Sequence, residues 1–81
     1  MARRYEYQVC SVQSARVTWV NGGWLGSVAP DSADHDAALK SCPTVWDYLQ
    51  SVGYDGWELT AAVAHETAEI SYEVLYLRRE R

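Results

Sequence analysis

The chain has 81 residues, enough for one hydrophobic core, so we expect a single domain spanning residues 1–81. Its formal net charge of −4 argues against a nucleic-acid-binding protein, because contact with phosphates requires a basic surface. No apolar run approaches the roughly 20 residues of a transmembrane helix, and no apolar segment follows the basic N-terminal residues as it would in a signal peptide. We therefore expect a cytoplasmic protein without membrane contact, in which Cys10 and Cys42 are free thiols.

The first part of the chain predicts strands joined by a tight turn. Residues 5–9 alternate apolar and polar side chains with a period of two, which is typical of a half-buried strand. Residues 16–20 have strand character too, and Asn21-Gly22 follows them as the strongest short signal of a type I′ hairpin turn. This turn places Trp19 opposite Trp24, at positions where cross-strand side chains approach most closely.

The middle of the chain predicts one short helix and one main helix. A cap at Asp31 or Ser32 is expected to start the short helix, within the least regular segment, residues 26–43. Thr44 is the expected N-cap of the main helix, and Gly53 is expected at its C′ position, where a positive φ is cheap for glycine. The apolar face of the main helix is formed by Val45, Tyr48, Leu49 and Val52.

The last part of the chain predicts two more strands. In the first, four alternate residues are expected to face the core: Trp57, Leu59, Ala61 and Val63. Residues 72–77 are apolar on both faces, which is typical of a central strand. The predicted fold class is therefore α+β: an antiparallel sheet of four to five strands in the order β-β-β-α-β-β, with one main helix packed on one face. The last strand lies between the first strand and the strand that begins at Trp57.

Three segments resemble a known family. They are the opening Tyr-Glu-Tyr-x-Val strand at residues 5–9, the Gly-Trp-Glu-Leu block at residues 56–59, and the closing Tyr-Leu-Arg-Arg strand at residues 76–79. Together they resemble the bacterial and phage family catalogued as domain of unknown function 4177, over about half of the chain. Gln8 stands where that family commonly has lysine, and the Asn-Gly hairpin and the acidic loop look like insertions. The resemblance implies a compact sheet-plus-helix unit and no activity.

Three groups of polar residues are candidates for chemistry, and each has a simpler structural explanation. The acidic loop around His35 is a candidate metal site. Cys10 or Cys42 could act as a nucleophile, with His35 or His65 as its base. Glu58 and Glu73 are a candidate acid–base pair. The loop matches no recognised metal-binding spacing, buried cysteines are common in cores, and the glutamates are expected to face solvent. We therefore predict no catalytic residue, no metal, no cofactor and no enzymatic activity.

The basic residues are concentrated at the two ends of the chain. If the first and last strands pair antiparallel, the terminal arginines converge into one basic patch on an acidic protein. The candidate anion- or partner-binding residues are Arg3, Arg4, Arg78 and Arg79. Arginine at such a patch binds phosphate or carboxylate groups, whereas the simpler explanation is neutralisation by neighbouring Glu6 and Glu80.

One helix can cover only one face of the sheet, so the other face is expected to be exposed and apolar. That face carries alternate residues of the last strand, either Leu75 and Leu77 or Tyr72, Val74 and Tyr76. Large exposed apolar patches usually mark interfaces. The candidate interface residues are Trp19, Trp24, Leu75 and Leu77. We therefore predict a non-enzymatic interaction or accessory domain that forms a homo-oligomer, most simply a two-fold dimer, or binds another protein. The alternative is a small-ligand or anion-binding module that uses the arginine cluster and adjacent aromatic residues.

Overall fold

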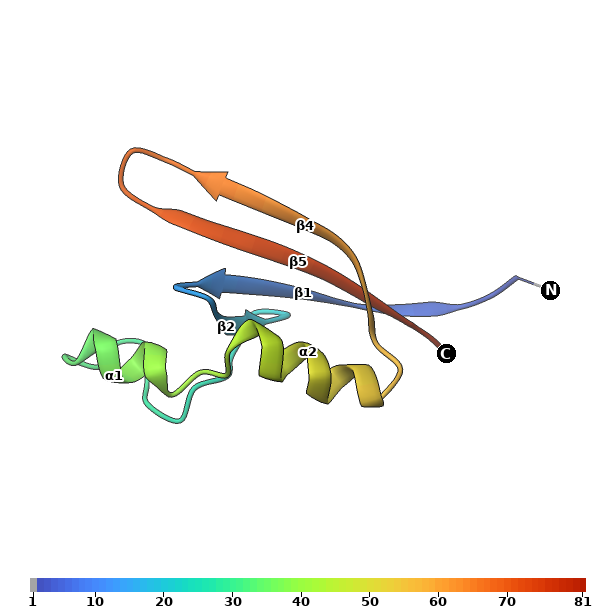
Figure 1. The fold of residues 1–81 in the computed structure, drawn as a ribbon, viewed down its shortest axis with the longest axis horizontal. Helices are drawn as coiled ribbons and strands as arrows, with labels where there is room; N and C mark the ends of the chain where they lie inside the picture. Colours follow the sequence, from blue (N-terminus) through green and yellow to red (C-terminus); the bar gives the residue numbers. More distant parts are fainter. Residues whose placement is uncertain (1) are drawn as a thin grey trace.

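In the computed structural model, which describes residues 2–81, two helices lie on the same side of a five-stranded antiparallel sheet (Figure 1). The strands are β1 (Tyr5–Gln13), β2 (Arg16–Val20), β3 (Gly23–Trp24), β4 (Glu58–Glu66) and β5 (Ser71–Glu80), and the helices are α1 (His35–Lys40) and α2 (Val45–Tyr54). The sheet order is β3-β2-β1-β5-β4. This confirms the predicted α+β class and the position of the last strand between the first strand and β4.

The core lies between the sheet and α2. Alternation along β1 and β5 directs Cys10, Val12, Leu75 and Leu77 to the helix side, where all four are buried together with Val17 of β2. The residues of α2 that pack against this cluster are Val45, Tyr48, Leu49 and Val52, which confirms the apolar face predicted from their spacing.

Tyr48 packs against this core, and its phenol stays protonated at neutral pH. Burial raises the pKa of Tyr48 to about 12, and its hydroxyl donates a hydrogen bond to the side-chain oxygen of Gln8 on β1. Tyr48 therefore fixes α2 to the middle of the sheet through a polar contact as well as through its ring.

The start of α2 confirms the predicted cap, but its end lies further along than predicted. The Thr44 hydroxyl accepts a hydrogen bond from the Asp47 N–H at 3.2 Å, as an N-cap does. The helix runs through Gly53 to Tyr54, and the left-handed residue is Gly56, with φ of +90°. The Asp55-Gly56 turn reverses the chain, so Gly53 is an ordinary helical residue.

Strand β4 contradicts the predicted core face. Leu59 and Val63 are 47% and 42% exposed, and Ala61 is exposed as well. The pairing with β5 shifts between Leu59 and Ala61, so a β-bulge turns Leu59 and Ala61 to opposite faces. Helix α2 packs over the other strands and leaves β4 uncovered, and only Trp57, just before β4, packs against the core.

The hairpin formed by β2 and β3 confirms the predicted Asn-Gly turn. Asn21 and Gly22 both have positive φ, and Trp19 pairs with Trp24 with ring centroids 5.2 Å apart in an edge-to-face arrangement. The Asn21 side chain also accepts a hydrogen bond from the Val9 N–H at 2.8 Å, so the turn is tied to β1 where β2 ends.

The two glycines at the end of α2 should respond oppositely to alanine. A Cβ at Gly53 meets nothing within 4 Å, so Gly53→Ala should stabilise the protein by about 0.5–1 kcal/mol through higher helix propensity. At Gly56 the same change forces alanine into positive φ and should cost about 1 kcal/mol or more. Urea unfolding of both variants measures the two shifts. A destabilising Gly53→Ala would contradict the helical assignment of that residue.

Candidate functional site

The face of the sheet away from the helices exposes a contiguous apolar surface, which we call the open face. It is formed across three neighbouring strands, because Tyr76 on β5 pairs with Val9 on β1 and with Ala61 on β4. Tyr7, Val9, Val63 and Tyr76 are 61%, 43%, 42% and 38% exposed. The half-buried members of the open face are Trp19, Tyr72 and Val74.

The structure corrects half of the predicted interface residues. Leu75 and Leu77 are 4% and 1% exposed and lie in the core beneath α2, so they are not available to a partner. The alternative set that the sequence left open, which includes Tyr76, faces away from the helices. Trp19 lies at the β2 end of the open face, and its partner Trp24 donates its indole N–H to the Val28 carbonyl at 2.8 Å.

The predicted arginine cluster does come together, but its members are largely paired. Arg79 forms an ion pair with Glu6 and lies 4.5 Å from the centre of the Trp57 ring. Arg78 forms an ion pair with Glu58 at 2.6 Å, and this hydrogen bond raises the pKa of Arg78. Arg3 lies 3.9 Å from Glu80, and no ion pair in residues 2–81 involves Arg4. A cavity of about 390 Å³ at this site is therefore lined by both arginine and glutamate side chains.

The other candidates for chemistry are not assembled into a site. Cys10 and Cys42 are buried free thiols, and burial raises the pKa of each, so neither is a ready nucleophile at neutral pH. Glu58 pairs with Arg78 near the start of β4, whereas Glu73 lies opposite Ala64. Residues 2–81 contain no group of three or more His, Cys, Asp or Glu side chains placed to hold a metal ion.

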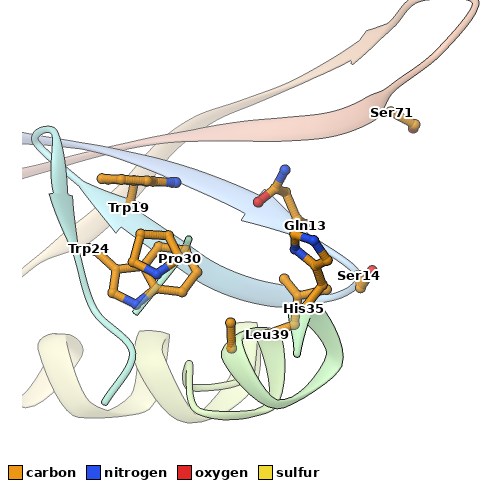
Figure 2. A pocket seen from close by; sticks show the side chains of 9 residues that line it. Gln13, Ser14, Trp19, Trp24, Pro30, His35, Leu39 and Ser71 are labelled. Atoms are coloured by element: carbon orange, nitrogen blue, oxygen red, sulfur yellow. The ribbon is translucent and has the colours of Figure 1, made fainter. Parts of the chain in front are cut away.

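A cavity of about 420 Å³ between the β1–β2 hairpin and α1 was not predicted from the sequence. Figure 2 shows the indoles of Trp19 and Trp24 with Pro30 at one end of the cavity, and Gln13, Ser14 and His35 at the other. The Trp19 indole nitrogen points toward Gln13 in this view. No hydrogen bond within residues 2–81 engages that indole N–H or the side chains of Gln13 and His35.

The lining of this cavity, which we call the Trp cavity, favours an uncharged ligand. Amide, imidazole and hydroxyl groups both donate and accept hydrogen bonds, as the hydroxyl and amide groups of a neutral ligand do. No arginine, lysine or carboxylate side chain is among its lining residues, so a phosphate or carboxylate would find no fixed counter-charge. The only sequence signal was the Trp19–Trp24 pair, because the groups at the opposite end come from segments far apart in the chain.

Comparisons with known proteins give no relative from which a role can be transferred. No family model, no curated protein and no solved structure matches the chain. The resemblance to domain of unknown function 4177 therefore stays a prediction. Across residues 2–81, every helix is too short or too polar to cross a membrane.

If the arginine cluster is structural, its members should differ in their effect on stability. Arg79→Met removes the ion pair with Glu6 and leaves that half-buried carboxylate without its main partner, so we expect a loss of about 1–2 kcal/mol. Arg4→Met should change stability by less than about 0.5 kcal/mol, because Arg4 is exposed. Thermal and urea unfolding measure both values, and equal effects would contradict the network described above.

Proposed function

We propose that the chain is a non-enzymatic interaction module that self-associates through the open face. The observation that carries this proposal is the placement of both helices on one side of the sheet (Figure 1). Tyr7, Val9 and Tyr76 are therefore left exposed on the opposite face. Burial of apolar surface at about 25 cal/mol per Å² favours covering such a face. A second copy is the simplest occupant, since a two-fold interface joins the same patch to itself.

The chemistry of the open face suits a partner surface better than bulk water. Its exposed tyrosines present large apolar rings together with hydroxyl groups that remain hydrogen-bonded at an interface rim. Arg78 lies directly opposite Tyr7 in the β1–β5 register, so a charged group borders the patch at one end. The paired state of Arg3, Arg78 and Arg79 is the reason we place self-association ahead of anion binding.

A charge placed in the middle of the open face should break the assembly. Tyr76→Glu puts a carboxylate between Val9 and Ala61, and desolvating that charge in an interface should weaken self-association by at least about tenfold, or 1.4 kcal/mol. Size-exclusion chromatography with light scattering over a range of protein concentrations measures the change.

The matched control for this experiment is Tyr54→Glu. Tyr54 is 88% exposed on α2, on the helix side of the sheet, so this variant should associate like the original chain. A monomeric original chain at high micromolar concentration would overturn the proposal. Dissociation by Tyr54→Glu alone would place the interface on α2 instead.

The Trp cavity supports a second candidate function, the binding of a small uncharged ligand. Its volume of about 420 Å³ lies within the range of small-molecule sites. The two indoles offer an apolar surface for one face of a ring, and the unpartnered polar groups of Gln13 and His35 match hydroxyl or amide substituents. This candidate differs from the small-ligand or anion-binding module predicted from the sequence, which used the arginine cluster and adjacent aromatic residues.

Neutral sugars test this second function directly. We expect glucose or N-acetylglucosamine to quench tryptophan fluorescence and to shift the amide resonances of residues around Gln13, with a Kd of about 1–10 mM. Glucose 6-phosphate should bind more weakly, since the cavity lining provides no cation. Gln13→Leu should weaken binding, whereas Gln50→Leu on the exposed side of α2 should not. No response to either neutral sugar would contradict this function.

A further inference from the structure

The two edges of the sheet are protected very differently. At one edge, β3 has only two residues, and the Leu25 N–H just beyond it still donates to the Thr18 carbonyl at 2.9 Å. At the other edge, β4 has nine residues and pairs with β5 on one side only. An unpaired edge of this length presents a row of backbone N–H and C=O groups to any further strand.

The middle of β4 lacks the usual devices that prevent edge-to-edge pairing. Its segment Ala61-Ala62-Val63-Ala64 has no charge and no proline, and all four residues are exposed. The β-bulge near Thr60 and the charge of Glu58 disrupt the first part of the edge, before this segment begins. The accessible part of the edge is therefore apolar, regular and free on both faces.

We propose that β4 pairs antiparallel with β4 of a second copy, so that two sheets join into one ten-stranded sheet. The charges on β4 select the register. A pair centred on Val63 places Ala62 opposite Ala64 and Ala61 opposite His65, and it keeps all glutamates of the two strands apart. A pair centred on Ala62 brings Glu58 of one copy toward Glu66 of the other, which costs free energy through like-charge repulsion.

This inference rests on the proposed self-association and specifies its geometry. The two-fold axis of an edge pair is perpendicular to the sheet, whereas the axis of a dimer packed through the open face lies parallel to the sheet. Two perpendicular two-fold axes close into a tetramer of D2 symmetry. Edge pairing also joins the open faces of two copies into one larger apolar surface. A second edge-paired dimer can then pack against this surface over a larger area than a single open face provides.

Paired substitutions on β4 test both the edge and its register. Ala62→Lys with Ala64→Lys places lysines opposite lysines across the axis, and we expect the tetramer to fall to a dimer that keeps the open-face contact. Ala62→Glu with Ala64→Lys places opposite charges across the same axis and should retain the tetramer. The matched control is Gln50→Lys with Ser51→Lys on the exposed side of α2, which should leave the mass unchanged.

Light scattering of all variants, with circular dichroism to confirm folding, separates the two proposals. If Ala62→Lys with Ala64→Lys has the same mass as the original chain, edge pairing is overturned while open-face association stands. If Tyr76→Glu has no effect and the lysine pair yields monomers, edge pairing stands and the open-face proposal fails. A monomeric original chain overturns both. Concentration-dependent protection of the Ala62 and Ala64 amides from hydrogen exchange is the expected independent sign of the edge pair, because the N–H of Val63 already faces β5.

Discussion

The structure depends on the limited area that α2 can shield. A helix of ten residues is about 15 Å long, whereas the ten-residue strand β5 spans about 33 Å. One helix is also only about 10 Å wide, so it covers little more than two strands that lie about 4.8 Å apart. Because of this mismatch, α2 buries Cys10, Val12, Leu75 and Leu77 at the middle of the sheet and leaves both β4 and the open face to solvent.

The polar contacts of the sheet divide according to the same limit. Where the helix side is covered, Tyr48 and Gln8 satisfy one another across the core, and Arg79 joins Glu6 to the chain reversal after α2 through the Asp55 carbonyl at 3.1 Å. Gln13 and the Trp19 indole, which line the Trp cavity beside the short helix α1, have no side-chain hydrogen bond within residues 2–81. The free polar groups and the exposed apolar side chains therefore mark two separate regions that α2 does not cover, the Trp cavity and the open face, and these are the two places where we propose binding.

How much the sequence predicts depends on whether a signal is local. The Asn21-Gly22 turn, the Thr44 cap and the apolar face of α2 are encoded within a few residues, and all three are found in the structure. The face assignment of β4 failed because one bulged residue reverses the alternation, and no local pattern marks the bulge near Thr60. The Trp cavity was missed because its two ends are brought together only by the folded sheet and α1.

The central position of β5 in the sheet has a consequence for folding during synthesis. Residues 71–80 are synthesised after β1 and β4, yet they pair with both strands and supply Leu75 and Leu77 to the core. The N-terminal hairpin can form within microseconds of leaving the ribosome, but it has no core to pack on until β5 arrives. Nascent chains that stop short of β5 are thus expected to be unfolded substrates for chaperones and proteases.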